Sequence, residues 1–113
     1  MKREQRLRSP ADFRRVRDVA PRGWPNRLLV LHAAPNELGR ARVGITVSGR
    51  VGNAVVRNKV RRRLREALRA RYPGLVPGKD LVIAARPASA SVSFQELCQA
   101  LDALLARAGA LRA

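Results

Sequence analysis

The sequence predicts one small domain that mixes α-helices and β-strands, and three observations lead to this prediction. The chain has 113 residues, a length that suits a single domain with one modest hydrophobic core. Residues 42–48 alternate between apolar and polar side chains, which is the period of a half-buried strand. Residues 53–72 place apolar side chains at helical spacing, so a long helix follows that strand.

The chain is predicted to begin with a short helix that starts at Ser9. Ser9 can cap its first turn, Pro10 suits the first helical position, and Asp12 favours the positive end of the helix dipole. The segments that follow are predicted to be a short strand near residues 19–25, a strand at residues 26–33 and a turn at residues 35–39.

The middle of the chain has two-faced elements. One face of the strand at residues 42–48 carries Val43, Ile45 and Val47, and the small, polar face carries Arg42, Gly44, Thr46 and Ser48. After a loop, Asn53 caps a helix whose apolar stripe is Val56, Val60, Leu64, Ala67 and Leu68. A strand at residues 79–86 and a helix after the capping box of Ser93 and Glu96 complete the order helix, strand, strand, helix, strand, helix.

The charge of the chain favours a polyanionic partner. There are 24 Lys and Arg residues against 8 Asp and Glu, which gives a formal net charge of +16. A compact domain with this excess repels itself, and the usual partners that relieve it are nucleic acids, anionic membranes and acidic proteins. Arginine far outnumbers lysine, and its planar guanidinium suits bidentate phosphate contacts and stacking on bases, so nucleic acid is favoured.

The helix at residues 53–72 carries most of this argument. At about 100° per residue, its basic side chains form an i, i+4 ladder of Arg57, Arg61, Arg65 and Arg69, with Asn58 and Arg62 beside it and Lys59 and Arg63 farther round. Like charges at this spacing cost an isolated helix about 0.2–0.5 kcal/mol per pair, and Glu66 is the only acid in the stretch. A polyanion would supply the missing charge, and the Asn58 amide suits a sugar hydroxyl or a base edge.

Two other interpretations of this helix are weaker. A helix that serves only solubility would intersperse charges of both signs. A membrane-surface helix would need large apolar anchors, whereas the apolar face here consists of Val, Ala and Leu and is needed for the core.

The sequence offers no group of residues for independent catalysis. His32 is the only histidine and has no Cys, Asp or Glu at a catalytic spacing, so we expect it at a cleft edge or on the surface. Cys98 is the only cysteine and is expected to be a core thiol in a reducing compartment. The segment GLVPGK at residues 74–79 lacks the length and the preceding strand of a phosphate-binding loop. With no metal-binding cluster, membrane span or signal peptide in the sequence, we expect a soluble cytoplasmic protein.

Residues 42–69 resemble one known family closely. The segments that carry the likeness are VGITVS at residues 43–48, RVGNAVVRN at residues 50–58, and the pairs Arg61-Arg62 and Arg65-Glu66. Together they resemble the signature of the protein component of bacterial ribonuclease P, in which a Gly-Asn-Ala-Val turn leads into an Arg-Asn helix. Weaker agreement covers nearly the whole chain and includes Phe13, Val16 and the strand at residues 80–86.

The resemblance implies a fold and two binding surfaces. The fold would be a single domain over residues 1–113, a two-layer α+β sandwich (in the broad α/β class) with a four-stranded mixed sheet and three helices. It would be similar to domain 2 of ribosomal protein S5, with a left-handed βαβ crossover, an exception to the usual hand. The catalytic RNA would bind Arg50, Asn53, Arg57, Asn58, Lys59, Arg61, Arg62, Arg65 and Arg69. The single-stranded 5′ leader of precursor tRNA would bind Phe13, Arg17, Leu31, Arg42, Thr46, Ser48 and Arg86.

The sequence departs from the family pattern at three positions. Gly49 stands where the family has the first of two lysines, and Arg17 and Leu31 stand where it often has aromatic residues. Stacking on a base contributes about 1–3 kcal/mol. Leader binding by this chain would therefore depend more on charge and on Phe13.

The resemblance also implies the function. The chain would be the accessory protein of ribonuclease P, an endoribonuclease whose RNA subunit catalyses leader removal to give the mature 5′ end of tRNA. Mg²⁺ would be held mainly by that RNA, and no residue of this chain would be catalytic or bind a metal. The partners would be the ribonuclease P RNA and precursor tRNA, with no membrane and no small-molecule cofactor. The alternative, from another class, is a noncatalytic structural RNA binder such as a ribosomal protein or an RNA chaperone.

Overall fold

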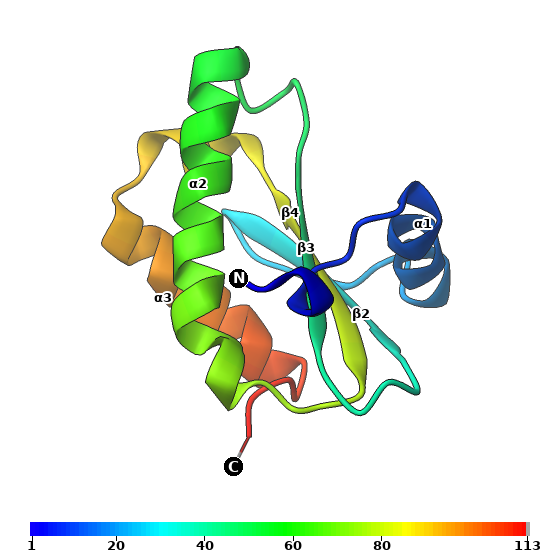
Figure 1. The fold of residues 1–113 in the computed structure, drawn as a ribbon. Coiled ribbons are helices and arrows are strands. Elements are labelled where there is room, and N and C mark those ends of the chain that lie inside the picture. Colours follow the sequence, from blue (N-terminus) through cyan, green and yellow to red (C-terminus); the bar gives the residue numbers. More distant parts are fainter. Residues whose placement is uncertain (113) are drawn as a thin grey trace.

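A computed structural model describes residues 1–112 of the chain, which form one sheet covered by helices on both faces (Figure 1). The strands are β1 (Trp24–Pro25), β2 (Leu29–Pro35), β3 (Arg42–Val47) and β4 (Lys79–Ala85). The helices are α1 (Pro10–Val19), α2 (Ala54–Arg71) and α3 (Phe94–Arg107), with the short 3₁₀ helices η1 (Arg3–Gln5), η2 (Tyr72–Gly74) and η3 (Pro87–Ser91). Helix α1 lies on one side of the sheet, and α2 and α3 lie on the other.

The sheet is mixed, and its topology places β3 at an edge. The strand order is β1-β2-β4-β3. Strand β2 pairs antiparallel with both β1 and β4, whereas β3 pairs parallel with β4. A parallel pair needs a crossover connection, and α2 is that connection. The predicted four-stranded mixed sheet with three helices is therefore confirmed.

Strict alternation along the strands divides the side chains between the two faces. Most odd-numbered residues of β2, β3 and β4, such as Leu31, Val43 and Ile83, are buried in the main core beneath α2 and α3. Helix α2 contributes its apolar stripe to this core, with Val60, Leu64, Ala67 and Leu68 all buried. The even-numbered strand residues face α1, where a smaller cluster forms from Leu7, Val16, Ala34 and Val82.

The predicted helix starts are confirmed by their capping bonds. The Ser9, Asn53 and Ser93 side chains each accept a hydrogen bond from the backbone N–H three residues on, at 3.0–3.1 Å. The strand predicted at residues 26–33 instead begins at Leu29 and runs to Pro35. The Asn26 side-chain oxygen accepts hydrogen bonds from the backbone N–H groups of Leu28 and Leu29, which holds the preceding residues in a turn.

Asp80 is a buried carboxylate that ties the α1 face of the sheet together. Its side chain is fully buried and accepts hydrogen bonds from the Arg42 Nε and Nη2 atoms at 2.9 and 2.7 Å. Asn36 Nδ2 donates to the same carboxylate at 2.7 Å, and Arg15 on α1 also forms an ion pair with it. Burial alone would raise the pKa of Asp80, but these hydrogen bonds and the charges of Arg42 and Arg15 outweigh it and hold the pKa below its ordinary value.

Asp80→Asn is expected to lower the free energy of unfolding by about 1–3 kcal/mol, because it leaves partly buried guanidinium groups without their counter-charge. The exposed acid Asp18 forms no ion pair within residues 1–112, so Asp18→Asn should change stability little. Urea unfolding of both variants at neutral pH measures the difference. Equal stability of the two variants would show that the Asp80 carboxylate does not hold α1 on the sheet.

The same carboxylate gives the stability a defined pH dependence. Its pKa is lower in the folded than in the unfolded chain, so the unfolded chain takes up the proton first as pH falls. The stabilisation is complete above the unfolded value of about 3.9 and fades as pH drops through the folded value. Unfolding curves are measured from pH 6 down to the acid transition, in steps of about one pH unit. The free energy of unfolding should fall with pH in the wild type, and it should fall less in Asp80→Asn.

Candidate nucleic-acid interface

Helix α2 presents a broad basic surface, defined here as the α2 arginine surface and consisting of Arg57, Arg61, Arg65 and Arg69 with Asn58, Lys59 and Arg62. Its orientation is fixed by the apolar stripe, which buries the opposite side of the helix against the sheet and α3. Arg57 and Arg61 are half-buried along the border with the sheet, whereas the other members are exposed. The ladder predicted from the sequence is therefore present, with Arg65 and Arg69 in solvent and Arg57 and Arg61 half-buried.

Few of these cations are neutralised within the protein. Among the nine residues predicted to bind the catalytic RNA, Arg69 alone forms an ion pair within residues 1–112, with Glu66 at 2.9 Å. Arg61 Nη1 donates to the Asn58 side-chain oxygen at 3.0 Å, which orders both groups at the surface. Arg57 Nε is buried and has no hydrogen-bond partner among the described residues. Arg63 differs from its neighbours because it donates to the Val92 carbonyl and lies toward η3.

Two further predicted residues flank the start of α2. Arg50 is exposed in the loop before the helix. Asn53 is exposed, but its side-chain oxygen accepts the bond from the Val56 N–H as the helix cap, so only its amide N–H groups remain for a ligand.

The second surface lies on the α1 face of the sheet and centres on Phe13. The Phe13 ring packs so closely over Gly44 that a Cβ atom on Gly44 would lie 2.5 Å from two ring carbons. Glycine at this position therefore lets the ring approach the strand backbone. Thr46, the next residue of β3 on this face, is half-buried. Arg42 also lies here, but Asp80 holds its guanidinium and Asp12 lies 3.6 Å from it.

The prediction that Leu31 contacts a leader is wrong. Leu31 is fully buried in the main core under α2 and α3, on the face of β2 opposite to Phe13. Because side chains alternate along a strand, its neighbour His32 occupies the α1 face. His32 was expected at a cleft edge or on the surface, yet it is buried, with Nδ1 2.7 Å from the Ala20 carbonyl oxygen.

The remaining predicted leader contacts lie at the margins of this face. Arg17 is exposed on α1, and Ser48 is exposed in the loop that follows β3. Arg86 is exposed after β4, and its Nη1 donates to the Asn26 carbonyl at 3.0 Å. The structure brings Phe13 and Thr46 onto one face but leaves these three residues around its border.

A hollow joins the two surfaces where the sheet ends. It measures about 160 Å³ and is lined by Phe13, Gly44 and Ile45 from the sheet side and by Arg61 and Arg65 from α2, together with Met1, Arg6, Leu7 and Val43. The lining contains no acidic residue. The junction can therefore accommodate an aromatic or planar group beside phosphates.

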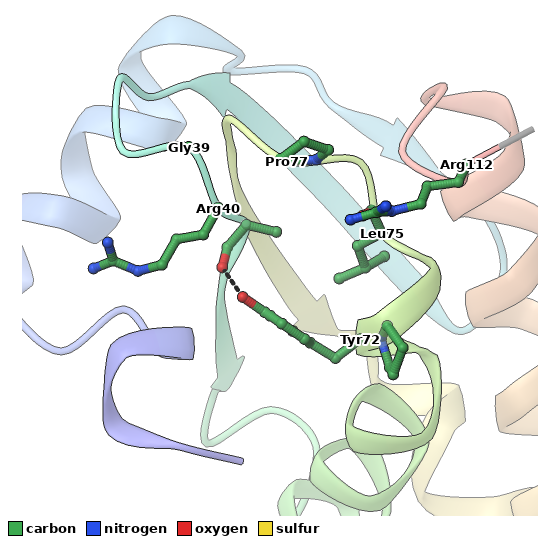
Figure 2. A pocket seen from close by; sticks show the side chains of 8 residues that line it. Gly39, Arg40, Tyr72, Leu75, Pro77 and Arg112 are labelled. Carbon is green, nitrogen blue, oxygen red and sulfur yellow. Dashed lines mark hydrogen bonds between the residues drawn. The ribbon is translucent and has the colours of Figure 1, made fainter.

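A second hollow, shown in Figure 2, lies beyond the C-terminal end of α2. The Tyr72 hydroxyl donates to the Ala41 carbonyl, and burial raises the pKa of Tyr72 above its ordinary value even though the charge of Arg40 opposes the shift. Arg112 Nε donates to the Leu75 carbonyl at 3.0 Å. These contacts fix the loop of residues 36–41 against the end of α2. The residues that line this hollow therefore have a structural role.

Sequence reasoning missed several residues of these surfaces. Arg6 lines the hollow at the junction, and Arg15 and Asp80 hold the α1 face together. The sequence feature that could have pointed to Asp80 is its place at the start of a strand, on the same face of the sheet as Arg42. A single acid buried there needs a cation as its partner. Nothing comparable singled out Arg6 before the path of the N-terminal segment was known.

Neither a metal site nor a membrane span emerges from the described part of the chain. Within residues 1–112, no three His, Cys, Asp or Glu side chains gather into a group that could hold a metal ion. None of the helices in this range is long and apolar enough to cross a membrane.

These features define a class of protein, a small α+β domain whose strongly basic helix borders the edge of a mixed sheet. Comparison with known proteins is more specific, because the profile of the Ribonuclease P family matches residues 1–109. The chain belongs to the ribonuclease P protein family. Its members take part in an endoribonuclease complex that processes tRNA.

Individual relatives agree over nearly their whole length. The chain is 47% identical to the ribonuclease P protein component of Roseiflexus castenholzii, with 99% of this chain and 92% of the relative aligned. It is 44% identical to that of Herpetosiphon aurantiacus, covering 96% and 87% of the two chains. The fold matches the RNase P protein of Staphylococcus aureus with a TM-score of 0.87 at 29% identity, covering 96% and 98%. The match to the Thermotoga maritima protein has a TM-score of 0.81 at 29% identity, covering 90% and 96%.

Gly44→Ala is expected to destabilise the protein by about 1–3 kcal/mol, because the added methyl group collides with the Phe13 ring. Gly49→Ala is the matched control, since a Cβ there would meet no atom within 4 Å. Chemical denaturation of these variants, of Phe13→Leu and of Gly44→Ala combined with Phe13→Leu measures the coupling between the ring and the glycine. If the double variant shows the simple sum of the two losses, the ring and the glycine do not interact as described.

Proposed function

We propose that this chain is the protein subunit of a ribonuclease P that binds the catalytic RNA and the 5′ leader of precursor tRNA. In this role it assists the endonucleolytic removal of the leader and the formation of the mature tRNA 5′ end. The observation that carries the proposal is the α2 arginine surface, whose outward-facing cations have one acidic partner, Glu66, within residues 1–112. Family membership supports the ribonuclease P RNA as the partner of this surface.

The α2 arginine surface supports binding to a folded RNA. Guanidinium groups spaced one helical turn apart can contact successive phosphates bidentately, and each neutralised phosphate releases counterions. Asn58, ordered by Arg61, adds a group suited to a sugar hydroxyl or a base edge. We assign Arg50, the amide of Asn53 and the α2 arginine surface to the ribonuclease P RNA.

The α1 face supports binding to a single strand. Phe13 offers an aromatic ring for stacking, fixed over Gly44, and Thr46 offers a hydroxyl beside it. Arg17, Ser48 and Arg86 at the border would contact the sugar–phosphate backbone. Arg42 is already paired with Asp80, so its charge would act on the leader less strongly than that of Arg17.

The chemistry is proposed to reside in the RNA subunit, which would hold Mg²⁺. That ion supplies the activation of water and the stabilisation of charge on the phosphate that hydrolysis requires. This chain would contribute binding energy and orientation by holding the leader and the catalytic RNA together and by reducing the repulsion between their phosphates.

Reconstitution tests this function directly. Adding the chain to a bacterial ribonuclease P RNA at low Mg²⁺ should raise the rate of precursor tRNA cleavage and the affinity for substrate. Cleavage that does not increase, together with retained RNA binding, would favour the alternative of a noncatalytic structural RNA binder.

The two surfaces are expected to respond differently to substitution. Arg57→Ala with Arg61→Ala should weaken binding to the ribonuclease P RNA more than binding of leader by the holoenzyme, and Phe13→Ala should do the reverse. Arg27→Ala with Arg107→Ala is the matched control, because it removes the same charge near β1 at the other edge of the sheet. Binding assays with precursor tRNAs with and without a leader separate the effects. An equal loss for all three variants in both assays would contradict the assignment of two surfaces.

A further inference from the structure

The N-terminal segment, residues 1–8, is a fixed strip along the edge strand β3. Leu7 N donates to the Val43 carbonyl at 2.9 Å, and Arg6 forms a parallel bridge with Val43. The Leu7 side chain is buried in the cluster beneath α1. At the start of the strip, Lys2 N donates to the Gln5 side chain at 3.1 Å and closes the η1 turn. Backbone contacts and one apolar anchor therefore position the segment, independently of its arginine side chains.

Three arginines of this segment point to solvent together. Arg6 and Arg8 lie on either side of the buried Leu7 in the sequence, and both are exposed to solvent. Arg3 is the first residue of η1, and Arg6 follows that helix directly in extended backbone. All three are exposed, and their side chains make no hydrogen bond or ion pair with any residue in the range 1–112. No acidic side chain within residues 1–112 therefore pairs directly with them.

The three arginines line one hollow of about 140 Å³ beside the start of α1. Arg40 and Arg42 also line it, against the acids Glu4 and Asp12. Arg42 belongs to the Asp80 pair, with Asp12 close to it, so these two groups add little free charge. Figure 2 shows Arg40 extending away from Tyr72 toward the N-terminal helix η1, where its Nε donates to the Glu4 carbonyl at 2.8 Å.

On its other side, the segment borders the α2 arginine surface. Arg6 lines the junction hollow together with Arg61 and Arg65. Lys2 lines a neighbouring hollow together with Arg69. The exposed cations of the segment and those of α2 thus adjoin along the edge of the sheet, and one polyanion can contact both.

We propose that Arg3, Arg6 and Arg8 form a second contact with the phosphodiester backbone of the ribonuclease P RNA, beside the α2 arginine surface. The contact rests on the proposed function, because it extends the surface assigned there to the same RNA. The ribonuclease P RNA is favoured over the leader because Arg6 shares the junction hollow with Arg61 and Arg65, and Lys2 of the same segment shares another hollow with Arg69. Guanidinium groups without acidic partners suit phosphate and carry no sequence preference of their own.

Exchange of the three arginines for glutamine in the full chain tests the proposal. The matched control is Arg22, Arg27 and Arg107 exchanged for glutamine, which removes the same charge near β1 at the opposite edge of the sheet. Affinity for a ribonuclease P RNA without substrate is measured at several salt concentrations. The N-terminal triple variant is expected to bind at least about tenfold more weakly than the control and to lower the salt slope by about 2–3, since each lost phosphate contact removes about 0.7–0.9.

Four results would overturn the inference. Equal affinity and slope for the two triple variants would show that only net charge matters. Unchanged RNA binding with weaker binding of leader-bearing precursor tRNA by the holoenzyme would assign the arginines to the leader. Absence of ribonuclease P RNA binding by the wild type would overturn this inference and the proposed function together. The Arg57→Ala and Arg61→Ala double variant could lose RNA binding while the N-terminal triple variant binds no more weakly than its control. That result would overturn this inference but leave the proposed function standing. Thermal unfolding of both triple variants verifies that they are folded.

Discussion

The constraint on which the rest of the structure depends is the self-repulsion of a net charge of +16 on 113 residues. The chain has few acids with which to relieve it, and it places several of them where a cation is partly enclosed. Asp80 is buried between Arg15 and Arg42, and Asp102 receives Arg71 from α2. Most other guanidinium groups remain in solvent, where water screens them. The acids thus join elements of the fold and leave the outer surfaces basic.

The mixed sheet converts this charge distribution into two surfaces of different chemistry. Alternation in the strands sends large apolar side chains toward α2 and α3 and leaves Gly44 and Thr46 on the α1 face. The parallel pairing of β3 with β4 forces the chain to cross through α2, which brings the α2 arginine surface alongside the edge strand. Because β3 is the edge strand, the helix surface and the sheet face meet there without an intervening strand. The N-terminal segment occupies that edge, and its arginines therefore lie between the two surfaces.

Much of this arrangement was accessible from the sequence because it depends on local patterns. The period of residues 42–48, the caps Ser9, Asn53 and Ser93, and the apolar stripe of α2 each specify an element without reference to distant residues. The direction of the arginine ladder followed from that stripe, since the opposite side of a helix must face solvent. The Leu31 prediction was wrong because it was carried over from the family by position in the sequence. In the structure, the side chain of Leu31 lies on the face of β2 that is buried in the main core. A shift of one residue along a strand exchanges core and surface.

What the sequence could not supply were contacts between distant segments. The Asp80 pairs join residues 38 and 65 positions apart, and the N-terminal strip joins β3 only after the sheet exists. The charges of α2 would also connect folding with ligand binding. Like charges along α2 oppose helix formation by about 0.2–0.5 kcal/mol per pair, and a bound polyanion removes that opposition. A ligand that binds only the folded chain stabilises it by mass action. Under the proposed function, the same guanidinium groups that oppose formation of the isolated helix would strengthen the complex with RNA, so the two effects would have one electrostatic origin.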